Sequence, residues 1–148
     1  MKIFFRNVAA VATGLVIGGC VNMGVVLAGP HVVPPPAGVD PRDAASIAAG
    51  IHLFAPRHFV FPFLAHALGT FAGALVAHLL ATNRRDFYAW AIGVVYLAGG
   101  LMACFMIPAP AWFMALDLVG AYLPAAWLAV RLGRRLRKDA LPRHARDS

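Results

Sequence analysis

The chain has 148 residues, of which 61% are hydrophobic and 13% are charged, and its formal net charge is +7. Soluble globular domains are about 45–50% apolar and about 25% charged, so this composition excludes a water-soluble protein and indicates a helical membrane protein. The positive charge does not indicate nucleic-acid binding, because seven of the thirteen Lys and Arg residues fall in one segment, 131–146, directly after an apolar run. That position is typical of a topology signal or of a contact with anionic lipid headgroups.

Four apolar runs, each about 20 residues or longer, are long enough for a helix to cross the roughly 30 Å hydrocarbon core of a bilayer. They cover residues 7–29, 58–81, 87–107 and 111–130. The sequence therefore predicts an all-α, polytopic membrane protein, a bundle of four transmembrane helices with a short outer surface helix. We expect a single membrane domain over 1–133 and a basic cytoplasmic tail over 134–148.

The first run contains "VIGGC", which is loosely similar to the motif that precedes a lipidated cysteine in bacterial lipoproteins. A cleavable signal peptide has an apolar region of only about 7–15 residues, whereas this run continues past Cys20 to Leu27. We therefore expect an uncleaved first helix. Cys20 and Cys104 both lie inside apolar runs and form no CxxC pair, which indicates free thiols.

The connection 30–57 opens with three consecutive prolines, which favour an extended polyproline II segment. Asp40 is a good helix N-cap, Pro41 suits the first helical position and Asp43 suits the first turn. Apolar residues then recur at helical spacing until Pro56, at Ile47, Ile51 and Phe54. This pattern predicts a short amphipathic helix on the outer membrane surface, and the alternative is an irregular loop.

Basic residues are distributed unequally between the two sides of the predicted bundle. The segment before the first run, the turn between the second and third, and the tail hold eleven Lys and Arg residues, whereas the 30–57 connection holds only Arg42 and Arg57. By the positive-inside rule both termini are cytoplasmic. We expect the protein in the inner membrane of a bacterium. The expected partners are the lipid bilayer and, at the basic tail, anionic lipid headgroups, and we expect no nucleic acid partner.

Few strongly polar side chains lie within the predicted spans: Asn22, His66, His78 and Asp117. At 1.5 Å per residue, Asn22 lies roughly 9–10 Å, His66 roughly 12 Å and Asp117 roughly 8–9 Å below the outer ends of their helices. Three helices thus place a polar residue in one layer of the outer half. His78 lies near the inner end of its helix, where we expect it to reach the cytoplasmic interface.

The polar residues of this layer share helix faces with small residues, which allow helices to approach closely in a membrane. In the first run, Asn22 follows Gly14 and Gly18 at four-residue spacing. In the second run, the face of His66 also carries Thr70 and the two glycines of "GTFAG". In the fourth run, the face of Asp117 also carries Gly120 and Ala121. We therefore predict that Asp117 pairs with His66 and that Asn22 is a neutral hydrogen-bond partner. Asn22, His66, Thr70 and Asp117 form the predicted polar cluster.

Two prolines lie in the predicted spans, Pro62 and Pro124, and each leaves a helix carbonyl without its N–H partner. They either widen the outer half into a small polar cavity or only shape the helices.

Three functional classes are compatible with an ionisable cluster inside the membrane. The first is an integral membrane protein in which the cluster fixes helix packing, as in a structural or accessory subunit. The alternative is a small proton-coupled transporter, which at this size would work as a homo-oligomer, or a membrane protein that binds a small polar ligand. An enzyme is the least supported, because HExxH, GxSxG and paired catalytic carboxylates are absent from the sequence. We predict no cofactor and no metal, since a metal site would need a third donor such as His52 or His58 beside His66 and Asp117.

Three stretches, "PPPAGVD", "HFVFPFLAHALGT" and "WFMALDLVGAYLP", together with "VNMG" in the first run, resemble a family of small, uncharacterised bacterial membrane proteins. The resemblance spans roughly residues 8–130. It implies a four-helix integral membrane protein and implies no activity, substrate or cofactor.

Overall fold

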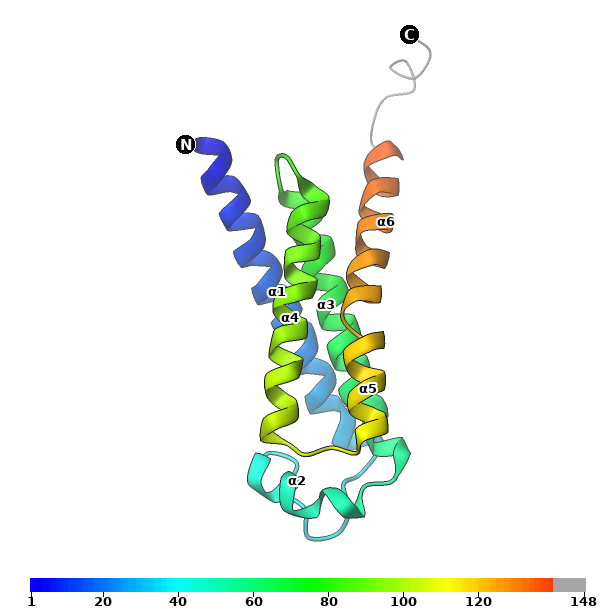
Figure 1. Ribbon diagram of the computed structural model, residues 1–148. Helices are drawn as coiled ribbons and strands as arrows, with labels where there is room; N and C mark the ends of the chain where they lie inside the picture. Colours follow the sequence, from blue (N-terminus) through cyan, green and yellow to red (C-terminus); the bar gives the residue numbers. More distant parts are fainter. Residues whose placement is uncertain (140–148) are drawn as a thin grey trace.

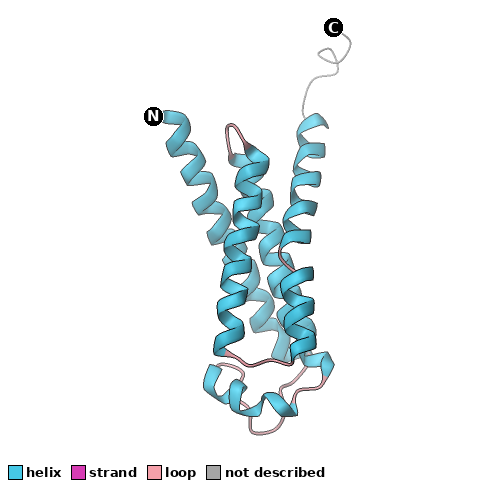
Figure 2. Ribbon diagram, in the orientation of Figure 1, coloured by secondary structure: helices cyan, strands magenta, loops and turns pink. Residues whose placement is uncertain are grey.

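The computed structural model describes residues 1–139, and this part of the chain is helical and contains no strand (Figures 1 and 2). Its helices are α1 (Lys2–Val32), α2 (Ala44–Gly50), α3 (Val60–Leu80), α4 (Arg85–Met106), α5 (Ala111–Gly120) and α6 (Leu123–Asp139), with short 3₁₀ turns η1 (Ile51–Leu53) and η2 (Pro56–Phe59). Four segments are long and apolar enough to cross a membrane: α1, η2 with α3, α4, and α5 with α6. The predicted all-α fold is confirmed, and it contains the four predicted segments that are long and apolar enough to span a membrane.

Helix α3 is the centre of the bundle and contacts α1, α4, α5 and α6. We call the end covered by residues 33–59 the capped end and the opposite end, where α1 begins and α6 ends, the terminal end (Figure 1). The residues of the capped end, 33–59, are called the cap.

The crossing of α1 and α3 is made by glycines on both helices. A Cβ added to Gly14 would lie 2.6 Å from the Gly73 carbonyl oxygen, and one added to Gly18 would lie 2.6 Å from the Gly69 carbonyl oxygen. The backbones therefore approach as closely as they do in GxxxG helix pairs of membrane proteins. The small-residue stripes predicted on these two helices do face each other.

The interior of the bundle is built from small side chains and its exterior from large apolar ones. In the described part of the chain, ten of the sixteen buried apolar residues are alanine, whereas Phe105 is 84% exposed and Val119 is 76% exposed. An apolar surface of this extent on the outside of the bundle is typical of helices that lie against another apolar phase, such as lipid.

The fourth predicted helix, 111–130, is wrong as a single unbroken element. It consists of α5 and α6, separated at Ala121 and Tyr122, and Figure 2 shows the break as a short loop segment. Pro124 causes the break, because it has no N–H for the carbonyl of Gly120 and its ring clashes with that carbonyl.

The other spans agree with the prediction within a few residues, except that α1 extends further at both ends, to Lys2 and Val32. The apolar run through Cys20 is one continuous helix. Pro62 lies in the first turn of α3, where an N–H has no helical partner in any case, so it does not interrupt the span. Helix α6 continues through 134–139, so the predicted tail begins as helix, and its remaining residues 140–148 lie outside the described residues.

The cap contains the predicted surface helix, but it begins later than expected. Asp43, not Asp40, is the N-cap of α2, and its carboxylate accepts hydrogen bonds from the backbone N–H groups of Ala45 and Ser46, each at 3.1 Å. Asp40 instead closes the preceding turn by accepting the N–H of Arg42 at 2.9 Å. An Asx turn of this kind satisfies the aspartate before the helix begins.

Candidate functional site

A hydrogen-bonded pair of side chains, one from α3 and one from α5, lies in the half of the bundle near the capped end. His66 Nδ1 lies 2.9 Å from Oδ1 and 2.8 Å from Oδ2 of Asp117. Asp117 is 3% exposed, whereas the side chain of His66 is 25% exposed. The predicted contact between the two residues is therefore confirmed, and only the histidine is accessible.

Tyr122 is the third member of this group, and it was not predicted from the sequence as part of the site. Its hydroxyl donates a hydrogen bond to Asp117 Oδ2 at 3.1 Å, and its ring stacks on the His66 ring with centroids 5.4 Å apart and planes 26° apart. Gly100 on α4 makes room for the phenol, because a Cβ at that position would meet the Tyr122 hydroxyl. The carboxylate of Asp117 is thus fully engaged by His66 and Tyr122.

The hydrogen bonds of Asp117 determine which nitrogen of His66 remains free. An ionised carboxylate can only accept hydrogen bonds, so when Asp117 is ionised His66 Nδ1 carries the hydrogen of this contact. In the neutral imidazole the lone pair is then on Nε2, which has no hydrogen-bond partner within the described residues. Such a nitrogen can accept a hydrogen bond from a bound molecule or take up a proton.

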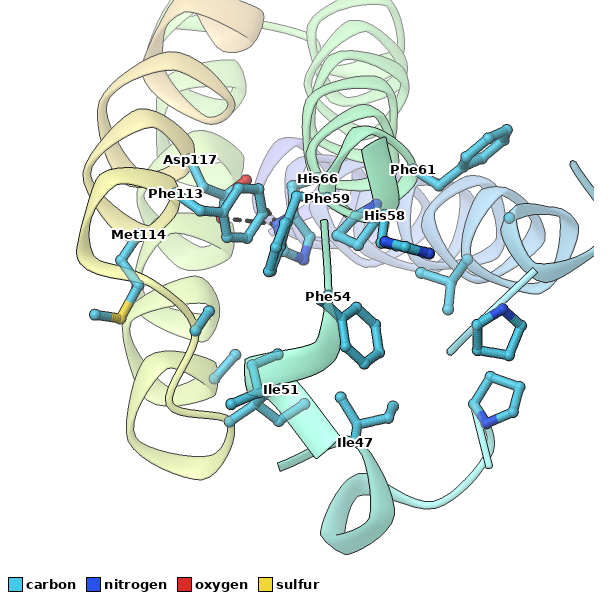
Figure 3. Close-up of a pocket in the computed structure, with 18 of the residues that line it drawn as sticks. Ile47, Ile51, Phe54, His58, Phe59, Phe61, His66, Phe113, Met114 and Asp117 are labelled. Carbon is cyan, nitrogen blue, oxygen red and sulfur yellow. Dashed lines mark hydrogen bonds and ion pairs between the residues drawn. The ribbon is translucent and has the colours of Figure 1, made fainter. Parts of the chain in front are cut away.

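His66 lines a cavity of about 290 Å³ between the cap and the ends of α1, α3, α4 and α5 (Figure 3). The apolar face of the cap forms one wall of this cavity. The three residues that the sequence places at helical spacing all line it: Ile47, Ile51 and Phe54. The surface helix of the cap therefore turns its apolar residues toward the end of the bundle.

The walls of the cavity are mainly apolar and aromatic, so it is an apolar cavity with a polar pair and not the small polar cavity that was one of the two alternatives for the prolines. Phe59 stacks at a tilt on Phe113, with centroids 4.7 Å apart, and Phe54 lies edge-on to His58 at 5.3 Å. All four of these residues line the cavity.

The cavity contains few groups that could bind a charge. None of the residues that line it is Lys or Arg, and its one acidic residue is Asp117. Within residues 1–139 no third His, Cys, Asp or Glu joins this pair to form a metal-binding group. With its histidines neutral, the lining therefore holds no positive charge to pair with an anionic ligand.

Two residues of the predicted cluster do not belong to the site. Asn22 makes no hydrogen bond with His66 or Asp117 in the described structure, which corrects the predicted role of Asn22 as their partner. Its Cβ lies instead at the α1–α3 crossing, 2.8 Å from where a Cβ of Gly69 would be. Thr70 is fully buried one turn from His66, and its hydroxyl has no hydrogen-bond partner in the described part of the chain.

A second polar group lies at the terminal end, where His78 had been expected to reach the cytoplasmic interface. His78 is buried instead, and its Nε2 lies 3.0 Å from Oδ1 of Asp86 on α4. Asp86 also pairs with Arg134 of α6, whose Nε lies 3.1 Å from Oδ2. His78 is therefore packed inside the bundle, in contact with Asp86, and does not reach the interface.

Asn7 of α1 is a further buried polar residue that was not predicted from the sequence. Its amide donates to Asn83 Oδ1 at 2.7 Å and to the Tyr88 hydroxyl at 3.2 Å, and its carbonyl accepts the N–H of Thr82 at 2.9 Å. Asn7 lies on the buried face of α1, seven residues before Gly14, and that spacing is the signal that could have revealed it.

Comparison of the chain with family models, with curated proteins and with solved structures finds no match.

Proposed function

We propose that this protein is an integral membrane protein of the bacterial inner membrane that binds a small, mostly apolar molecule in the cavity beneath the cap. One observation supports this proposal more than any other: His66, held by Asp117, exposes a free imidazole nitrogen beside a cavity of about 290 Å³. Ligand sites are typically mostly apolar pockets with a few polar groups that orient the ligand, and this volume is near the lower end of their range of roughly 300–1,000 Å³.

The proposed orientation places both termini in the cytoplasm and the cap outside, because eleven of the thirteen Lys and Arg residues belong to the terminal end and the tail. The basic side chains at the end of α6 are exposed, and in this orientation they would lie at the level of the cytoplasmic lipid headgroups. Arg131 already lies over the ring of Trp127, at 4.3 Å from the centroid, as expected at an interface.

A role in packing alone is the second candidate, and the environment of Asp117 favours it. This carboxylate is almost fully buried and has two partners, so it would join α3 to the break between α5 and α6 whether or not a ligand binds. We give ligand binding the preference because packing alone does not require His66 to line a cavity.

Transport is less well supported. The two histidines of α3, His66 and His78, are separated by twelve residues, roughly 18 Å of helix, and the residues between them include the buried Thr70, Gly73 and Ala74.

The proposal is tested with a variant that fills the cavity from the cap. Ile51 lines the cavity, whereas Leu53 lies on the same 3₁₀ turn, is 51% exposed and does not line it. Ile51→Trp should remove a bound small molecule that native mass spectrometry detects on the protein purified from its host membrane, and Leu53→Trp should leave it in place. If no molecule is found on the wild type, or if both variants retain it equally, the cavity is not the binding site.

A further inference from the structure

We infer that the ligand of this cavity is an uncharged aromatic molecule of about two fused rings with a hydroxyl group that donates a hydrogen bond to His66 Nε2. This inference rests on the proposed function and adds the chemical class of the ligand.

The charges around the cavity exclude ionic ligands. An anion such as a carboxylate or phosphate would find no Lys or Arg in the lining, the neutral imidazoles of His66 and His58 carry no charge to pair with it, and the one acidic side chain would repel it. A cation would need Asp117, but that carboxylate is 3% exposed and already accepts hydrogen bonds from His66 and Tyr122. A neutral ligand is what remains.

Hydrogen bonding selects a ligand that carries a donor. The bond from Nδ1 to Asp117 leaves His66 Nε2 as an acceptor in the neutral imidazole. His58 also lines the cavity, but its Nδ1 lies 2.9 Å from the backbone nitrogen and 3.0 Å from the carbonyl oxygen of Ala55, so these contacts do not fix which ring nitrogen carries its hydrogen. A hydroxyl group can donate to His66 Nε2, whereas an aliphatic amine would be cationic at neutral pH.

The shape and lining of the cavity favour an aromatic body. Four phenylalanines line it together with the ring of His66, and aromatic side chains prefer stacked or edge-on aromatic partners. These are Phe54, Phe59, Phe61 and Phe113 (Figure 3). A cavity of roughly 150 Å³ holds one benzene ring, so a cavity of about 290 Å³ has room for two fused rings.

The test uses four naphthalene probes and the full chain in lipid nanodiscs, with empty nanodiscs as the blank for partitioning into lipid. Calorimetric titration should show that 2-naphthol binds about 3- to 10-fold more tightly than either naphthalene or 2-methoxynaphthalene, which lack a donor. It should also show that 2-naphthoate, which is anionic, binds more weakly than 2-naphthol. Equal binding of 2-naphthol and 2-methoxynaphthalene, or strongest binding of 2-naphthoate, would overturn the inference.

Two further measurements separate the ligand class from the site itself. The variant His66→Phe should bind 2-naphthol no more tightly than naphthalene. A second measurement uses the wild type and is needed if this variant does not fold. The ¹⁵N resonance of His66 Nε2 should shift when 2-naphthol is added and should not shift when 2-methoxynaphthalene is added. No shift, or unchanged binding by His66→Phe, contradicts the hydrogen bond. If all four probes bind equally tightly and all are lost in Ile51→Trp but kept in Leu53→Trp, the cavity is still the binding site and the hydroxyl class is refuted. No binding that depends on Ile51 would refute the proposed function as well.

Discussion

At the scale of single residues, the defining feature of this protein is a buried carboxylate that is shared by two aromatic side chains. Asp117 accepts hydrogen bonds from His66 and from Tyr122, which come from two different parts of the bundle. Removing one partner leaves a buried polar group unsatisfied, which costs more than the net value of the bond.

We expect Asp117→Asn and His66→Gln each to lower the free energy of unfolding by about 1–3 kcal/mol. The double variant should lose clearly less than the sum, by about 0.5–3 kcal/mol, because the second change removes a group that is already unpaired. Reversible unfolding in mixed micelles measures these values. Additive losses would mean that the two side chains do not interact in the protein.

Thr70 should behave in the opposite way, although it lies on the same helix one turn away. Its hydroxyl is buried without a hydrogen-bond partner within the described residues, so Thr70→Val removes an unsatisfied polar group and keeps the shape. We expect this variant to be as stable as the wild type or more stable by up to about 1 kcal/mol. A loss above about 1 kcal/mol in the same unfolding assay would show that Thr70 has a partner, such as a water molecule.

The sequence predicted the Asp117–His66 pair because both residues lie at one depth and on faces with small residues. It could not predict Tyr122 as their partner. Five residues along an unbroken helix turn the side chain by about 140°, so Tyr122 is expected away from the face of Asp117. The break between α5 and α6 turns Tyr122 back toward the carboxylate, and that break depends on how the chain accommodates Pro124.

At the scale of the helices, close approach through glycine decides how α1 and α3 pack. A Cβ on Gly18 would lie 2.6 Å both from the Gly69 carbonyl oxygen and from the Tyr96 hydroxyl. The Tyr96 hydroxyl in turn donates to the Leu15 carbonyl at 2.8 Å and joins α4 to α1. One glycine thus lies at the contact of three helices.

Gly18→Ala should therefore destabilise the bundle by about 1–3 kcal/mol, since backbone on α3 must move to admit the methyl group. Gly24→Ala on the same helix is the matched control, because no atom lies within 4 Å of its added Cβ. The control should change stability by no more than about 1 kcal/mol, in the stabilising direction. Thermal unfolding monitored by circular dichroism in micelles distinguishes the two, and equal effects would contradict the importance of the close contact at Gly18.

The ends of the helices were harder to predict from the sequence than their existence. Hydropathy located all four spans, but it stops at the last apolar residue, whereas α6 continues through the basic residues up to Asp139. Its exposed Arg and Lys side chains do not oppose a helix, and Asp86 of α4 pairs with Arg134 on it. Helix propensity and this ion pair, rather than hydropathy, extend the element.

At the scale of the whole molecule, the cap turns an open bundle end into a cavity. The sequence predicted the amphipathic spacing of Ile47, Ile51 and Phe54, but spacing alone does not tell whether such a face meets lipid or protein. Here it closes over the ends of four helices, with His66 and Asp117 at the wall (Figure 3). The site therefore combines segments that are far apart in the sequence and could not be assembled from periodicity.

The orientation of the molecule in the membrane is the last prediction. The terminal end carries Lys2, Arg6 and the basic part of α6, whereas the cap carries Arg42 and Arg57 as its only Lys or Arg residues. Moving basic residues across a bilayer is unfavourable, so the end with the larger number of them stays in the cytoplasm. Alkaline phosphatase fused at residue 45 should be active, and green fluorescent protein fused at the same residue should not fluoresce. At the C-terminus the phosphatase should be inactive and the fluorescent protein should fluoresce.

The matched variant Arg42→Gln should not change this result, because it only increases the difference in basic residues between the two ends. If both positions report the same side, the chain crosses the membrane an even number of times between them, and the four-span topology is wrong; if both reporters are inverted, the cavity opens to the cytoplasm.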